Sequence, residues 1–169
     1  LENGHLEKSN IANHNDIKPK KKIKSIKRIC ENFFTKHPNQ ILNIGCGLGF
    51  ETIALSEIYN CEITGIDISK DGINYAKKYN FNSKTSYISK AVDKTFLLSK
   101  KFDACYAIEF YPFTRTDNLE FQKEIVSAIL RNLNKEAPLI IYHLDLKEDT
   151  VNKNIKEISS SLNLKFKKI

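Results

Sequence analysis

Apolar residues along the chain recur at two spacings, and each spacing predicts a different kind of element. Short apolar runs between turn residues predict buried strands, whereas apolar residues three or four positions apart predict amphipathic helices. From residue 40 onward the two patterns alternate. The predicted strands span residues 40–44, 62–68, 85–89, 102–108, 139–144 and 164–169, and the predicted helices span 50–59, 70–79, 118–133 and 151–162.

This alternation indicates a single α/β domain. Strands joined through helices form βαβ units with right-handed crossovers, and such units build a mostly parallel sheet. A length of 169 residues suits one domain. The sequence therefore predicts a doubly wound, mostly parallel sheet of six strands with helices on both faces.

The N-terminal part of the chain is polar and differs from the rest. Residues 1–17 show no periodicity and predict a flexible tail. In residues 18–37, apolar residues recur at helical spacing with lysines between them, which predicts a basic amphipathic helix that ends before Pro38. We therefore expect one domain over residues 18–169, made of this helix and a core of residues 40–169.

The positive charge of the chain is concentrated in this helix. The net charge of +7 arises from 27 basic and 20 acidic residues, and seven basic residues fall between Lys18 and Arg28. Two interpretations stay open: a surface for nucleic acid or another polyanion, or the solvated face of an ordinary helix. Only three arginines occur in the chain, although arginine is the preferred residue for bidentate phosphate recognition. The scarcity of arginine favours the solvated face.

Composition argues against several other classes of protein. No apolar run approaches the roughly 20 residues that span a bilayer, and no secretory signal is visible. The four cysteines lie far apart, without the pairs that zinc sites or disulfide frameworks require. We therefore expect a cytoplasmic protein with reduced thiols, no bound metal and no membrane partner. Because the chain contains no methionine, we do not expect it to be the complete translated product.

A glycine loop follows the first predicted strand. Glycines occupy positions 45, 47 and 49, between the first strand and the next helix. Gly45 permits a sharp exit from the strand, Gly47 leaves the backbone open to a ligand, and Gly49 lets the helix pack closely. The helix N-terminus then offers free N–H groups to a carboxylate or phosphate. The loop therefore predicts a ligand site.

An acid, Asp67, ends the second predicted strand. Because neighbouring parallel strands end at the same edge of a sheet, we expect Asp67 to lie near the glycine loop, where a carboxylate can accept both hydroxyls of a ribose. A helix cap or a surface acid is the alternative role. The dinucleotide fingerprint G-x-G-x-x-G would require glycine at the position of Phe50, so a nicotinamide cofactor is a weaker hypothesis.

These motifs resemble the class I methyltransferases that use S-adenosylmethionine, which are Rossmann-like α/β enzymes. The resemblance covers roughly residues 25–165. Besides the G-x-G-x-G loop and the acid of the second strand, it includes the fourth-strand segment 101–109 and the turn 130–139 into the fifth strand. It implies S-adenosylmethionine as the cofactor and methyl transfer by in-line displacement. It also implies that the first helix covers the cofactor site.

The sequence departs from the family pattern at several points. Asn43 stands where the family usually has an acid that holds the methionine amino group, so that position keeps a hydrogen-bond acceptor without its charge. Asp93 is the candidate for the acid that reads the adenine amino group, and the family's seventh strand is not visible. Cys46 reads as a small neutral filler. The candidate cofactor-binding residues are Asn43, Gly45, Cys46, Gly47, Gly49, Asp67, Ile68, Asp93 and Tyr106.

Residues after the fourth and fifth strands are expected to face the acceptor. His143 and Glu109 are the candidate catalytic residues, since imidazole titrates near neutrality and a carboxylate can act as a base. The alternative for His143 is an ordinary histidine at a strand end. Tyr111, Phe113 and Tyr142 are candidate substrate contacts, and the alternative for the aromatic segment is a packed loop.

The leading hypothesis is a methyltransferase that acts on a small-molecule acceptor. One alternative is an RNA or protein methyltransferase that uses the basic helix, and another is a catalytically silent module with the same fold. The Asn/Asp-Pro-Pro-aromatic signature of DNA amino-methyltransferases is absent after the fourth strand, which argues against methylation of DNA bases. Neither the acceptor nor the oligomeric state follows from the sequence.

Overall fold

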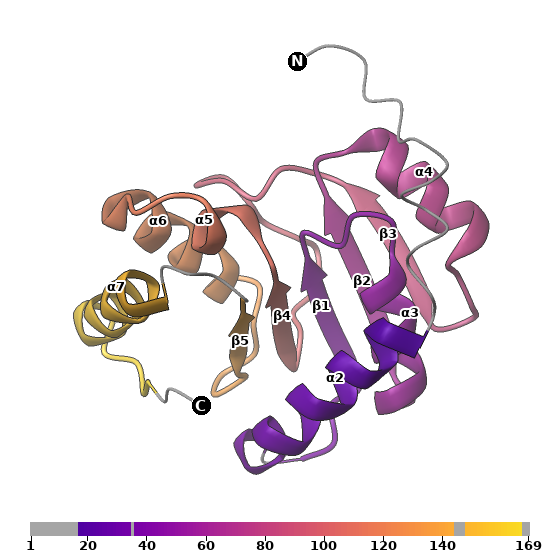
Figure 1. Ribbon diagram of the computed structural model, residues 1–169, viewed down its shortest axis with the longest axis horizontal. Coiled ribbons are helices and arrows are strands. Elements are labelled where there is room, and N and C mark those ends of the chain that lie inside the picture. The colour runs from indigo at the N-terminus through magenta and orange to yellow at the C-terminus, as the bar shows by residue number, and fades with distance from the viewer. Residues whose placement is uncertain (1–16, 35, 144–147, 167–169) are drawn as a thin grey trace.

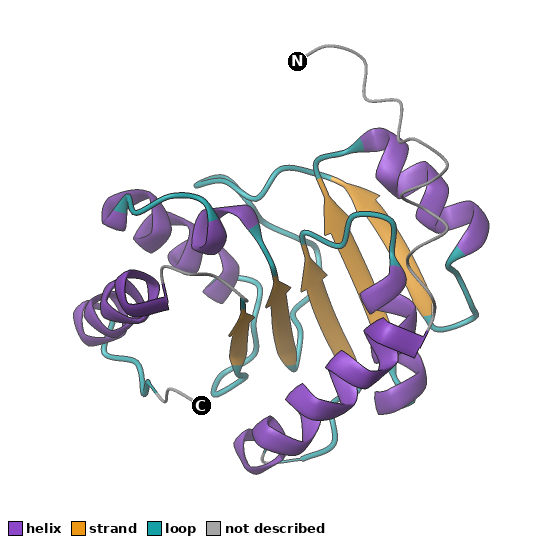
Figure 2. Ribbon diagram, in the orientation of Figure 1, coloured by secondary structure: helices purple, strands orange, loops and turns teal. Residues whose placement is uncertain are grey.

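The computed structural model describes residues 17–34, 36–143 and 148–166. Helices and strands alternate through most of this part of the chain (Figure 2). The helices are α2 (Ile17–Cys30), the short 3-10 helix η1 (Glu31–Phe33), α3 (Phe50–Tyr59), α4 (Lys70–Tyr79), α5 (Tyr111–Thr114), α6 (Leu119–Leu130) and α7 (Glu148–Ser161). The strands are β1 (Gln40–Ile44), β2 (Glu62–Asp67), β3 (Thr85–Ser89), β4 (Ala104–Ile108) and β5 (Leu139–Tyr142).

The five strands form one parallel sheet in the order β3-β2-β1-β4-β5. Ile41 in the central strand β1 lies opposite Ile63 of β2 on one side and Ala104 of β4 on the other. All five arrows point the same way in Figure 1. The predicted α/β fold with a doubly wound parallel sheet is therefore confirmed.

The sixth predicted strand, over residues 164–169, is a correction. Among the residues described there, 164–166 do not form a strand, and 167–169 lie outside the described residues. Asn163 adopts a left-handed conformation, with φ of 54°, and the Leu164 N–H donates to the Ser159 carbonyl at 2.8 Å. These are the features of a helix C-cap. The backbone after α7 therefore closes the helix instead of joining the sheet.

The helices cover the two faces of the sheet separately. Right-handed crossovers that step outward from β1 to β3 place α3 and α4 on one face, and steps in the other direction place α6 on the opposite face. Helix α2 lies along α3, while α5 and α7 lie with α6 on the other side (Figure 1). No helix among the residues described combines the length and apolarity needed to cross a membrane.

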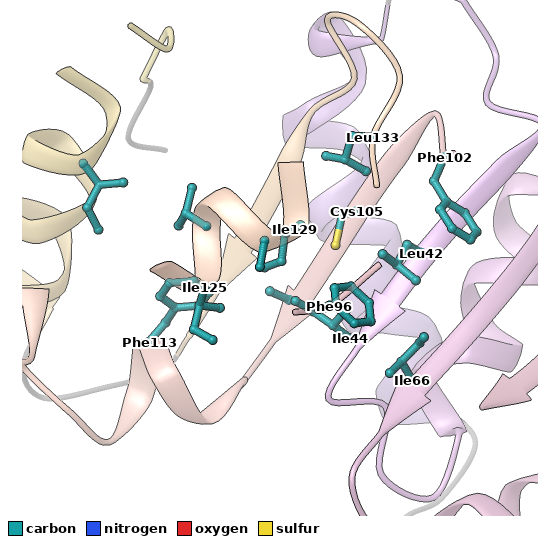
Figure 3. Close-up of a cluster of buried hydrophobic side chains, with 14 of the residues drawn as sticks. Leu42, Ile44, Ile66, Phe96, Phe102, Cys105, Phe113, Ile125, Ile129 and Leu133 are labelled. Atoms are coloured by element: carbon teal, nitrogen blue, oxygen red, sulfur yellow. The ribbon is translucent and has the colours of Figure 1, made fainter. Parts of the chain in front are cut away.

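The larger core lies between the sheet and α6. Side chains of β1, β2 and β4 that point to this face, such as Leu42, Ile66 and Cys105, meet Ile125 and Ile129 of α6 (Figure 3). All five of these residues are fully buried. Burial of an aliphatic side chain of this size stabilises a fold by about 1.5–3 kcal/mol. This core makes the central strands a rigid support for whatever lies at their ends.

The basic N-terminal helix packs against α3. Ile23 and Ile26 are buried against the sheet and α3, while Lys20 pairs with Glu57 at 2.9 Å and Lys22 pairs with Glu51 at 3.2 Å. The α-helix ends at Cys30 and the 3-10 turn at Phe33, earlier than the predicted end at residue 37. The predicted flexible tail lies outside the described residues except for residue 17, which begins α2.

The four cysteines are free and buried. Burial, followed by the nearby Asp67 carboxylate, raises the pKa of the Cys46 thiol to about 12, and burial raises the pKa of the Cys61 thiol to about 11. We expect the native protein at pH 8 to resist a thiol reagent that labels all four cysteines after unfolding in guanidinium.

The same pKa shifts predict a loss of stability at alkaline pH. An unfolded thiol ionises near pH 8.5, whereas the buried thiols stay neutral to higher pH. Their contribution to stability is therefore complete below about pH 8.5 and declines as the pH rises toward the native pKa values. Denaturation midpoints measured between pH 7 and 10.5 would test this. Rapid labelling of the native protein would contradict the burial on which both expectations rest.

Candidate cofactor and active site

The carboxyl ends of β1 and β4 lie side by side at the centre of the sheet. From β1 the chain steps toward β3, whereas β4 leads toward β5, so the direction of winding changes between these two strands. In open α/β sheets, ligands bind at the carboxyl ends of the strands at such a switch point. The residues that follow β1, β2, β4 and β5 therefore define the candidate site.

The glycine loop after β1 adopts left-handed backbone conformations. The φ angles are +69° at Gly45, +50° at Gly47 and +85° at Gly49, a region that glycine enters without steric penalty. A Cβ added at Gly47 would have no atom within 4 Å, whereas one at Gly49 would lie 2.8 Å from both the Ala76 Cβ and the Tyr87 hydroxyl. Gly47 is therefore open toward a ligand, and Gly49 permits close packing.

Asp67 faces this loop from the end of β2. One carboxylate oxygen accepts a hydrogen bond from the Gly47 N–H at 2.9 Å, and the other accepts from the Ser69 N–H at 2.8 Å. A carboxylate has about four acceptor positions, so each oxygen can accept a further donor. Ser69 itself caps α4 by accepting from the Gly72 N–H at 3.0 Å. The neighbourhood of Asp67 and the loop matches the expectation from the sequence.

The other candidates near this edge differ in exposure and in bonding. Ile68, next to Asp67, is 77% exposed, so a large apolar side chain stands in solvent beside the carboxylate. Asp93 is exposed and forms a turn, in which it accepts from the Thr95 N–H at 2.8 Å and the Thr95 hydroxyl at 2.6 Å. These bonds lower the Asp93 pKa. The structure therefore gives Asp93 a local role in its own loop.

Three predicted cofactor contacts turn their side chains into the interior. The Asn43 side chain, 1% exposed, donates to the Thr52 hydroxyl at 2.9 Å. Cys46 packs into a small apolar cluster under α4, as its interpretation as a neutral filler predicts. Tyr106 is fully buried, and its hydroxyl bonds to that of Tyr59. We therefore correct the assignment of Tyr106: it belongs to the core beneath α2 and α3.

The edge at which the sequence predicts acceptor contacts begins where β4 ends. Glu109 is exposed and has a φ of +51°, and its N–H donates to the Tyr142 carbonyl of β5 at 2.8 Å. The three predicted substrate contacts differ in exposure. Tyr111 is 56% exposed and Tyr142 is partly buried, whereas Phe113 is fully buried in the main core. Phe113 is therefore a packing residue, as the packed-loop alternative supposed.

His143 directly follows β5 at the same edge. Its Nδ1 atom is buried, and it has no hydrogen-bond partner. A buried polar atom without a partner carries a free-energy penalty of about 1–3 kcal/mol, and in native proteins such atoms call for an explanation such as a catalytic role. His143 is the one side chain for which an unpartnered buried polar atom is found among the residues described.

A family model described as a methyltransferase domain matches residues 41–136. This match covers more than half of the chain and includes the glycine loop, Asp67 and the edge at Glu109. The chain belongs to the methyltransferase domain family.

Relatives of this methyltransferase domain match less than half of its length. The chain is 34% identical over 74 residues to the sterol 24-C-methyltransferase of Candida albicans, which covers 41% of the chain and 20% of that protein. It is 36% identical over 74 residues to the O-methyltransferase cnsE of Penicillium expansum, covering 41% and 26%. The chain thus spans about a fifth to a quarter of the length of these relatives.

Among solved structures, the plantazolicin methyltransferase BpumL in complex with a pentazolic desmethylPZN analog and SAH has the same fold. The TM-score is 0.66 at 20% sequence identity, and the similarity covers 94% of this chain and 70% of that one. At this identity the likeness concerns the fold alone. This likeness in fold covers nearly the whole chain.

Sequence reasoning missed one contact at the centre of the site. The ring of Phe110 lies against Gly45, where an added Cβ would come within 2.6 Å of the Phe110 Cδ2 atom. The short helix α5 that follows was also not predicted, although Pro112 in its first turn is a signal for a helix start. A four-residue helix is too short for apolar periodicity to reveal.

Proposed function

We propose that this methyltransferase domain binds S-adenosylmethionine and transfers its methyl group to a small-molecule acceptor. The observation that carries the proposal is the pairing of the Asp67 carboxylate with the Gly47 N–H beside an open glycine surface. A carboxylate held by the loop in this way has acceptor positions left for two ribose hydroxyls. The bare backbone at Gly47 lets the ligand approach more closely than any side chain would.

The residues at the edge of the sheet would hold each part of the donor differently. The cofactor supplies a sulfonium-activated methyl group, so the protein mainly positions the reactants and excludes water. Asp67 would accept from the ribose hydroxyls, and the exposed Ile68 side chain would cover one face of the adenine. The N-terminus of α3 favours a negatively charged group, and the carboxylate of the methionine part meets that requirement.

The names of the relatives support a small acceptor. They include a sterol methyltransferase and an O-methyltransferase of fungi. On this chain, the acceptor edge is short and formed by Glu109, Tyr111, Tyr142 and His143. The exposed Tyr111 ring and the partly buried Tyr142 ring would contact an apolar part of the acceptor. Two tyrosines and one histidine at this edge suit an acceptor hydroxyl or amine.

We further propose that His143 is the general base. Its buried Nδ1 atom has no hydrogen-bond partner, and a base at this edge of the sheet would take the proton that the acceptor loses. We expect His143→Asn to lower kcat by about 100-fold at unchanged affinity for S-adenosylhomocysteine, since the donor half of the site stays intact. An unchanged kcat would assign the base to Glu109, and the matched variant Glu109→Gln would then show the loss.

A second candidate is a silent domain that binds the donor without turnover. Asn43 favours it, because the amide replaces the usual acid and its nitrogen is already bonded to Thr52. The alternative of an RNA methyltransferase draws less support. Two of the lysines on α2 are paired with glutamates of α3, which accounts for part of the basic surface by helix packing.

Calorimetric titration with S-adenosylhomocysteine tests the donor site. We expect saturable binding, and absence of binding at millimolar ligand would remove the proposal. A screen of acceptors with isotopically labelled S-adenosylmethionine then separates turnover from silent binding. Binding of RNA that weakens with salt, and that Lys20→Glu with Lys24→Glu abolishes, would instead favour the RNA alternative.

A further inference from the structure

The Phe110 ring covers the part of the glycine loop nearest β4. A Cβ built at Gly45 would lie 2.6 Å from the Phe110 Cδ2 atom, and two more atoms of the ring would lie within 3.5 Å of that Cβ. The ring is therefore in van der Waals contact with the Gly45 backbone, with no room for another atom between them. A Cβ built at Gly47, two residues further on, would have no atom within 4 Å.

The order of the strands puts this contact on the path of a bound donor. The ribose site at Asp67 is at the end of β2, and the acceptor edge is at the ends of β4 and β5. Strand β1 lies between β2 and β4, so a donor that extends from Asp67 to the acceptor edge crosses the end of β1. Such a ligand passes Gly45, and the Phe110 ring covers one side of that glycine.

Both sides of Phe110 in the chain are held in place. Before it, the Glu109 N–H is bonded to Tyr142 of β5. After it, the buried Gln122 side chain donates to the Pro112 carbonyl at 2.8 Å and to the Thr116 carbonyl at 2.9 Å. A backbone fixed on both sides leaves rotation of the side chain about its own χ angles as the motion that can expose Gly45.

We propose that Phe110 gates the donor site: its ring closes the Gly45 surface in the free protein and must rotate away before the methionine part of the donor can bind. This inference rests on the proposed function. A closed conformer that predominates reduces the apparent affinity by the fraction of molecules that are open. Removal of the Phe110 ring therefore restores the full affinity for the donor.

Titration of Phe110→Ala with S-adenosylhomocysteine tests the gate. We expect about tenfold tighter binding and faster association than in the wild type, which corresponds to a gate that is closed in about nine-tenths of the free molecules. The matched control is Phe81→Ala, because Phe81 is an exposed phenylalanine outside the site, and its affinity should equal that of the wild type. Unchanged or weaker binding by Phe110→Ala would overturn the gate and make Phe110 a wall of the site.

A measurement on the unmodified chain keeps the test independent of the variant's folding. The ring current of Phe110 shifts the resonance of the Gly45 α-proton that faces the ring edge, and we expect this shift to vanish when S-adenosylhomocysteine saturates the protein. Retention of the shift at saturation would overturn the gate. Failure of the wild type to bind at all removes the proposed function, whereas wild-type binding without a gain in Phe110→Ala removes the gate alone.

Discussion

Replacement of Asp67 by alanine is expected to lower the affinity for S-adenosylhomocysteine by at least about 100-fold. Two hydrogen bonds from ribose hydroxyls to a carboxylate contribute about 1.5–3 kcal/mol each, and each 1.4 kcal/mol corresponds to a factor of ten in affinity. The substitution also removes the acceptor for the Gly47 N–H, although the Cys46 N–H still donates to the Ile66 carbonyl of β2 at 3.0 Å. Calorimetry on the folded variant measures the loss.

Two further variants separate charge from position. Asp67→Asn keeps one acceptor oxygen without the charge and should fall between the wild type and Asp67→Ala. Asp71→Ala removes another acid, in the first turn of α4, and should leave the affinity within about twofold of the wild type. Affinity of Asp67→Ala within threefold of the wild type would mean that no ribose is bound at Asp67.

The second large effect is on stability, and it distinguishes two glycines of the same loop. Gly49→Ala should destabilise the fold by about 3 kcal/mol. The left-handed backbone at φ of +85° costs a residue with a Cβ about 1–2 kcal/mol. Overpacking adds about 1–3 kcal/mol, since the new Cβ would lie 2.8 Å from the Ala76 Cβ. For a domain of this size the midpoint of thermal unfolding should fall by roughly 10 °C.

Gly47→Ala is the matched comparison. The backbone penalty at φ of +50° is similar, but the added Cβ meets no atom within 4 Å. We therefore expect a loss of only about 1–2 kcal/mol in stability, together with weaker donor binding because the new methyl group occupies the open surface. Equal destabilisation by the two substitutions would show that packing at Gly49 contributes nothing.

The sequence predicted the parts of the fold that periodicity and turn chemistry specify. The core strands and the helices α3, α4, α6 and α7 lie close to their predicted positions, because each is long enough to show its spacing. The contact of Asp67 with the loop followed from residue type and strand order. Local signals of this kind are consistent with the final structure, as foldable sequences require.

The remaining differences arise where tertiary contacts decide. Tyr106 and Phe113 lie beside the predicted site in the sequence, but the placement of the helices buries both of them. Leu164 and Phe166 alternate like a strand, yet no partner strand lies beside them in the part of the chain that the structure describes. The contact of Phe110 with Gly45 joins residues that are far apart in the chain, so no local pattern could reveal it.

The hydroxyl pair of Tyr59 and Tyr106 has a consequence for the history of the family. Each hydroxyl lies in the core with the other as its partner. Replacement of one tyrosine by phenylalanine would leave the other hydroxyl buried without a hydrogen-bond partner. Replacement of both would leave an apolar contact of the same shape. Related chains with this packing should therefore carry tyrosine at both positions or phenylalanine at both, and mixed pairs should be rare intermediates between the two.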